Sequence, residues 1–135
     1  MVIDKEVLAA LKVWFAGYVD SFRSRSEDLD TNVALKAEHS RRVCTEILDI
    51  GRSRGLSEHD MCFAEAVALL HDVGRFEQYA RYGTFMDGRS ENHAALGVRI
   101  LREEEVLKTI DCETRAMVLR IVAAHNRASL PENES

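Results

Sequence analysis

The chain has 135 residues, a length that predicts one domain over residues 1–135 rather than two. Its net charge is −5 with histidine neutral, because 18 lysines and arginines face 23 aspartates and glutamates. This acidic balance argues against sequence-independent binding of nucleic acid, which needs a basic face that replaces counterions along the phosphate backbone. No apolar run reaches about 18 residues, and Asp4, Lys5 and Glu6 place charges where a signal peptide would be apolar. We therefore expect a cytoplasmic protein that does not enter a membrane.

The cysteines support this compartment. Cys44, Cys62 and Cys112 are odd in number, far apart and free of any Cys-x-x-Cys pair, as is typical of proteins in a reducing environment. All three fall in helical patterns. We therefore predict that they pack in the core as small hydrophobic side chains.

The first half of the chain contains two predicted helices separated by a polar run. Apolar side chains in residues 7–22 recur at the spacing of an amphipathic helix, whose apolar face we expect to pack within the same bundle. Residues 23–30 are polar and should end this helix. Thr31 or Asn32 can cap a second helix, which should end within residues 51–55. Its predicted inward face consists of Leu35, His39, Val43, Ile47 and Ile50.

Three more helices are predicted in the second half. A third helix begins after Ser57, where the sequence resembles a capping box, and is expected to end at Gly74. Residues 75–90 show no sustained period, which predicts a long functional loop with about one turn of helix. A fourth helix begins near Ser90 and a fifth near Asp111. No segment alternates apolar and polar residues for long enough to form a strand, so the predicted fold class is all-α.

Four histidines stand where the helical period would otherwise place an apolar residue: His39, His71, His93 and His125. A single histidine at such a position is more often a partly buried side chain with a hydrogen-bond partner. Four on separate helices are harder to explain in this way, because each buried imidazole costs stability unless it finds a partner. A metal ion can satisfy them all, since neutral imidazole binds metals through either ring nitrogen. The fifth histidine, His59, lies in a polar first turn and is predicted to be a surface residue.

Asp72 strengthens the prediction of a metal site. It follows His71 directly at the expected end of the third helix. Adjacent helical residues point about 100° apart, so both can reach one ion only if the ion lies beside the helix end. The terminal carbonyl groups there carry partial negative charge, which also favours a cation. A His-Asp pair is common by chance, and the three further inward histidines are what make the pattern specific.

In this order, the elements resemble the HD superfamily of metal-dependent phosphohydrolases. The segment AVALLHDVGRFEQY is similar to the family's Ala-x-Leu-Leu-His-Asp-Ile-Gly core. His39 begins a stretch that resembles the upstream His-x-x-Arg-Val element, and His93 one that resembles the downstream His-x-x-x-Gly element. His125, in the run IVAAHN, matches the later histidine of members with a two-metal site. The resemblance extends over residues 37–126.

The resemblance implies an HD-like bundle of five or more helices that hold metal ions between them. His39, His71 and Asp72 would ligate a first ion. Asp72 would bridge to a second ion, which His93 and His125 would hold. Imidazole-rich sites suit Fe, Mn, Co, Ni or Zn better than Mg, so we expect one or two such ions as cofactors.

One ligand of the family pattern is missing. Family members supply a last aspartate on a helix after the His125 position, and here no aspartate follows Asp111. Glu132 and Glu134 lie in a polar tail and are poor substitutes. Two interpretations remain open: the chain is a piece of a longer protein, or it is a natural variant with a weakened first site.

The implied activity is hydrolysis of a phosphate ester by a nucleotide phosphatase or phosphodiesterase, with a phosphorylated small molecule or nucleotide as substrate. We predict catalytic roles for Asp72 and Arg75, and phosphate binding by Arg75 and Arg42, because a guanidinium can hold phosphate through two hydrogen bonds. A structural arginine that caps helix carbonyls is an equal alternative for Arg75. Two other functions stay open: an inactive metal-binding regulatory domain, and a di-iron oxygenase with the same ligand set. A homo-oligomer formed through the first helix is also possible.

Overall fold

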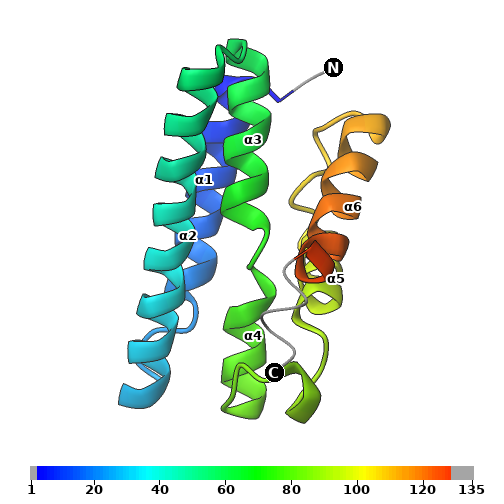
Figure 1. Ribbon diagram of the computed structural model, residues 1–135. Helices are drawn as coiled ribbons and strands as arrows, with labels where there is room; N and C mark the ends of the chain where they lie inside the picture. Colours follow the sequence, from blue (N-terminus) through cyan, green and yellow to red (C-terminus); the bar gives the residue numbers. More distant parts are fainter. Residues whose placement is uncertain (1–2, 129–135) are drawn as a thin grey trace.

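The computed structural model describes residues 3–128, and within that range the chain is all-α, as predicted. It forms six α-helices and one short 3-10 helix (Figure 1), and no strand occurs in the described range. None of the helices in this part of the chain is both long and apolar enough to cross a membrane. The elements are α1 (Lys5–Asp20), α2 (Glu27–Arg54), α3 (Glu58–Leu70), α4 (Gly74–Tyr82), η1 (Asp87–Arg89), α5 (His93–Glu103) and α6 (Cys112–Ala128).

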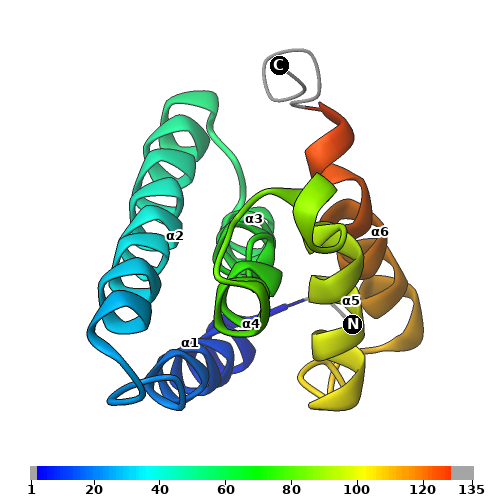
Figure 2. The same cartoon turned by 90° about the horizontal axis from the view of Figure 1, so that it is seen from below.

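The central elements of the bundle are α3 and α4, which follow one another along its length (Figure 1). On one side, α1 and α2 pack against α3, and on the other, α5 packs against α4 and α6. Figure 2 shows the same arrangement from below, with α3 and α4 between the two groups. The short junction between α3 and α4 is therefore accessible to side chains from both groups.

Aromatic side chains join α1 to this central column. The apolar face of α1 buries Leu8, Leu11 and Phe15, which confirms that the first helix packs within the bundle. The Phe15 ring meets the Phe76 ring of α4 edge-on at a centroid distance of 5.8 Å, and the Phe22 ring lies 6.2 Å from the same ring. Such aromatic pairs add to the stabilisation that burial itself provides.

The second helix differs from its prediction in both start and face. It begins at Glu27 rather than after Thr31 or Asn32, because the Ser26 side chain accepts a hydrogen bond from the Leu29 amide at 3.1 Å. Leu35 and Ile50 are 58% and 56% exposed, so their predicted inward placement was wrong. The buried face consists of Leu29, Val33, Ala37, Ser40, Cys44 and Gly51.

The prediction of a long loop after Gly74 was also wrong in its first part. Gly74 begins α4 instead of ending α3, since the Arg75 amide donates to the Asp72 carbonyl at 2.9 Å and continues the chain into a new helix. Among the cysteines, Cys44 and Cys62 are buried as expected. Cys112 is exposed because it stands at the first position of α6, which corrects the prediction for that residue.

Candidate metal centre

His71 and Asp72 lie in the junction between α3 and α4. The His71 amide still donates to the Val67 carbonyl at 2.8 Å, so the chain follows the helix for one residue beyond Leu70. Asp72 is next and is only 6% exposed. The two side chains thus stand beside the end of α3, where the sequence requires them to be if both are to reach one ion.

Gly74 allows α5 to approach this junction closely. A Cβ atom at Gly74 would lie 2.7 Å from the Gly97 backbone nitrogen, and closer still to the carbonyl oxygen of His93. Only a residue without a side chain permits this backbone-to-backbone contact. As a result, the His93 Nε2 atom comes within 3.5 Å of Asp72 Oδ1.

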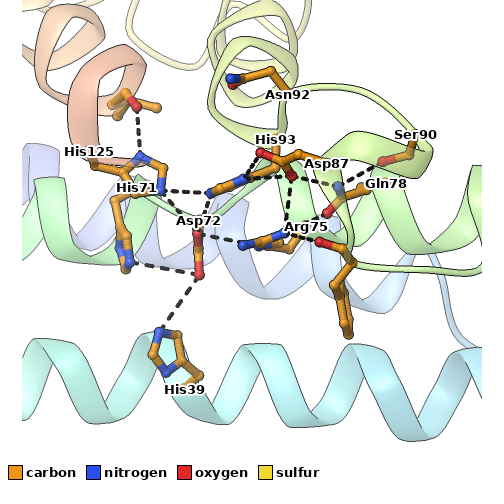
Figure 3. Close-up of polar contacts among 12 residues, drawn as sticks. His39, His71, Asp72, Arg75, Gln78, Asp87, Ser90, Asn92, His93 and His125 are labelled. Atoms are coloured by element: carbon orange, nitrogen blue, oxygen red, sulfur yellow. Dashed lines mark hydrogen bonds and ion pairs between the residues drawn. The ribbon is translucent and has the colours of Figure 1, made fainter. Parts of the chain in front are cut away.

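Four imidazole nitrogens surround the Asp72 carboxylate (Figure 3). The Nε2 atoms of His39 and His71 lie 3.7 and 3.8 Å from Oδ2. The Nε2 atoms of His93 and His125 lie 3.5 and 3.3 Å from Oδ1. Asp72 therefore turns one oxygen to each pair, and the five side chains form two groups of potential metal ligands that share this aspartate.

Hydrogen bonds from Nδ1, the ring nitrogen that faces away from Asp72, orient three of the histidine rings. His71 Nδ1 donates to the Ala68 carbonyl at 2.6 Å, and His125 Nδ1 donates to the Val122 carbonyl at 2.7 Å. His93 Nδ1 donates to the Asp87 carboxylate at 3.0 Å. Because carbonyl and ionised carboxylate oxygens only accept, we assign the ring proton to Nδ1, which leaves the Nε2 lone pair directed at the cluster. Metal-binding histidines are commonly held in this way.

Positive charge would stabilise the cluster. His93 Nε2 and His125 Nε2 lie 3.0 Å apart, and with both protons on Nδ1, two lone pairs face each other. The nearby Asp72 oxygen is a third acceptor, 3.3 Å from His125 Nε2. Acceptors at these distances repel unless a proton or a metal ion lies between them. The geometry is thus that of a site built for positive charge.

Electrostatics keep the carboxylate ionised. Burial alone would raise the pKa of Asp72, but the carboxyl group titrates at low pH, where the histidines are protonated; a hydrogen bond from protonated His125 Nε2 and the positive charges of His71, Arg75 and His93 then bring that pKa well below its usual value. Burial lowers the pKa of His71 and of His93, so both rings are neutral near neutral pH. For His125, burial also acts to lower the pKa, but the protonated ring can donate from Nε2 to Asp72, and this hydrogen bond outweighs burial and raises the pKa.

A second polar network supports His93 from the segment after α4. The fully buried Gln78 donates to Asp87 Oδ1 and to the Ser90 hydroxyl, both at 2.9 Å. Arg75 Nη1 donates to Gln78 Oε1 at 2.9 Å and to the Phe85 carbonyl at 2.7 Å. These contacts tie the segment to α4 and place Asp87 against His93. Sequence reasoning missed Asp87 and Gln78, since neither belongs to a periodic pattern and no other signal marks them.

The structure brings together all the residues predicted as metal ligands: His39, His71, Asp72, His93 and His125. Arg75 lies beside them, with Nε 3.9 Å from Asp72 Oδ1. Arg42 is exposed on α2, one turn after His39, and makes no hydrogen bond or ion pair within residues 3–128, so its substrate role stays a prediction. His59 is exposed, as expected. Glu132 and Glu134 lie outside the described residues.

Comparison with known protein families identifies the family of this chain. The family model of the HD domain matches residues 37–134. The chain belongs to the HD domain family. HD domains form a superfamily of metal-dependent hydrolases that bind divalent metals, and the clustered histidines and Asp72 are side chains able to hold such an ion. Searches of curated proteins and of solved structures found no match.

Proposed function

We propose that this HD domain is a metal-dependent phosphohydrolase that cleaves a phosphate ester of a nucleotide or another phosphorylated small molecule. The observation that carries the proposal is the Asp72 carboxylate, with one oxygen turned to His39 and His71 and the other to His93 and His125. The first pair with Asp72 would hold one ion and the second pair a second ion. This nitrogen-rich set of donors suits Fe, Mn, Co, Ni or Zn.

The donor geometry fits this cofactor. Each group offers three protein atoms within 4.8 Å of one another, and three protein ligands are typical of catalytic metal sites, which keep a position for water or substrate. When bound, two such ions supply a hydroxide at neutral pH and stabilise the attacking and leaving oxygens of the phosphate. The facing lone pairs of His93 and His125 are compensated by the same positive charge.

The side chains of the chain itself hold and shield this centre. Asp72 stays ionised and would bridge the two ions, while the Nδ1 contacts of His71, His93 and His125 keep their rings from rotating. Burial of Asp72 and His93 keeps water from one side of the cluster. Arg75 Nε is buried and has no hydrogen-bond partner in the described part of the chain. We assign it the role of donating to a phosphate oxygen next to Asp72.

The test compares variants of two cluster residues, His71 and Asp72, with a variant of the exposed His59. Purified protein with Mn²⁺ is assayed for hydrolysis of p-nitrophenyl phosphate and bis-p-nitrophenyl phosphate, in the wild type, His71→Ala, Asp72→Ala and His59→Ala. Wild type and His59→Ala should be active, because His59 is exposed and lies outside the cluster. His71→Ala and Asp72→Ala should lose metal and activity. Equal activity of Asp72→Ala and wild type, or metal binding by the wild type without hydrolysis of any phosphate ester, would overturn the proposal, and the second result would favour a regulatory domain.

A further inference from the structure

Lys36 is a half-buried cation at the edge of the cluster that none of the roles above uses. It lies on α2 three residues before His39, and residues with this spacing share one side of a helix. Its ammonium nitrogen stands over the Phe85 ring, 4.9 Å from the ring centroid. Within residues 3–128 it has no hydrogen bond and no ion pair. A half-buried ammonium group without an acceptor is electrostatically incomplete.

The surroundings of Lys36 connect it to the metal centre. The ring beneath Lys36 belongs to Phe85. The backbone carbonyl of Phe85 accepts a hydrogen bond from Arg75 Nη1. Arg75 in turn approaches Asp72 through Nε. Burial lowers the pKa of Lys36, the Asp72 carboxylate opposes that change, and the Arg75 guanidinium adds to it. Lys36 and Arg75 are thus neighbouring cations on the edge of the cluster where Phe85 lies.

We propose that Lys36 binds an oxyanion at this edge, namely a non-bridging oxygen of the phosphoryl group of the substrate. The inference rests on the proposed function, and it assigns recognition of the negative charge of the substrate to a residue of α2. Arg75 Nη1 is already occupied by Phe85 and Gln78, whereas all three donors of Lys36 are available. In a chain of net charge −5, such a cation offsets the repulsion that a phosphate would meet on approach.

Contact with the Phe85 ring suits Lys36 to this task. Lysine has a flexible stem that loses conformational freedom when its ammonium group is held by a ligand. The cation–π contact restrains the ammonium before a ligand arrives, which reduces that loss. The competing explanation is purely structural: Lys36 would join the segment after α4 to α2 and bind nothing. The two explanations differ in their effect on phosphate binding.

The experiment measures binding of inorganic phosphate to the Mn²⁺-loaded protein by isothermal titration calorimetry. Lys36→Met removes the charge and keeps an apolar stem against Phe85. Lys108→Met removes one equal charge from an exposed lysine whose partner is Glu105 and serves as the matched control. Lys36→Met should weaken phosphate binding about 10- to 100-fold, the effect of losing one charged hydrogen bond. Lys108→Met should bind like the wild type, and Lys36→Arg, which keeps the charge, should retain most of the affinity.

Two controls make the result decisive. Metal content and the urea midpoint are measured for every variant, and unchanged phosphate affinity in Lys36→Met would overturn the inference. It would also be overturned if Lys36→Met and Lys36→Arg both lost metal or stability, because the role would then be structural. If the wild type cleaves no ester but binds phosphate through Lys36, the proposed activity fails and the anion site stands. If esters are cleaved with the same KM and the same phosphate inhibition in Lys36→Met as in the wild type, the proposed activity stands and the anion site at Lys36 fails.

Discussion

Replacing Gly74 by alanine should destabilise the protein, because α4 and α5 meet at this position through backbone atoms. The new Cβ would lie 2.7 Å from the Gly97 nitrogen and closer to the His93 carbonyl oxygen. Neither neighbour can rotate away. Overpacking costs up to about 3 kcal/mol, and removal of a helical glycine returns at most about 1 kcal/mol. We therefore expect a net loss of about 2 kcal/mol in the free energy of unfolding.

The assay is equilibrium unfolding in urea followed by far-ultraviolet circular dichroism. Gly17→Ala is the matched control, because Gly17 is an exposed helical residue whose Cβ would meet nothing within 4 Å. That variant should gain up to about 1 kcal/mol from helix propensity alone. If Gly74→Ala were as stable as the wild type while Gly17→Ala gained stability, the close contact between α4 and α5 would be refuted. The position of His93 beside Asp72 would then need another explanation.

One further prediction concerns Asp87, and two concern Cys44. Asp87→Ala removes the acceptor for His93 Nδ1 and should weaken metal binding about 10- to 100-fold, as measured by competition with a chelator. Asp87→Asn keeps a carbonyl acceptor and should lose less, whereas wild-type affinity in Asp87→Ala would argue against a supporting role. Burial raises the pKa of the Cys44 thiol to about 11, so iodoacetamide at pH 8 should modify the exposed Cys112 and spare Cys44, as read by peptide mass spectrometry. Because this pKa lies above the unfolded value of 9.0, the thiol stabilises the fold below pH 9, and that contribution is lost as the pH rises to about 11. The urea midpoint of Cys44→Ala should therefore fall less between pH 9 and about 11 than that of the wild type. An equal fall in the two proteins would contradict a raised pKa of Cys44 in the folded state.

The clustering of the candidate metal ligands was predictable, because each histidine stands where the helical period of the sequence would place an apolar residue. His71, His93 and His125 are directed inward in the structure, as the period predicts. His39 is a different case, since it lies at the margin of the buried face of α2. That face is lined at its centre by the small residues Ala37 and Ser40, which let α2 approach α3. A prediction based on large apolar residues therefore turned the helix towards Leu35, which is exposed.

The segment after Asp72 was less predictable, because its contacts arise only in the folded chain. Gly74 resembles a helix terminator in the sequence, but in the structure it provides space for the backbone of α5. Asp87 stands six residues before His93, and a regular helix does not bring side chains with this spacing together. Its role depends on the chain reversing after α4, with Gln78 and Arg75 holding the returning segment. No local pattern carries that information.

The two-ion centre is tested most directly by counting the metal bound per chain. Metal-free wild type and Asp72→Ala would be titrated with Mn²⁺, and bound metal determined after dialysis. Because the Asp72 oxygens face both histidine pairs, the wild type should bind two ions, and Asp72→Ala should retain neither at the concentration that saturates the wild type. Equal stoichiometry in the two proteins, or no bound metal in the wild type, would contradict a centre built on this carboxylate.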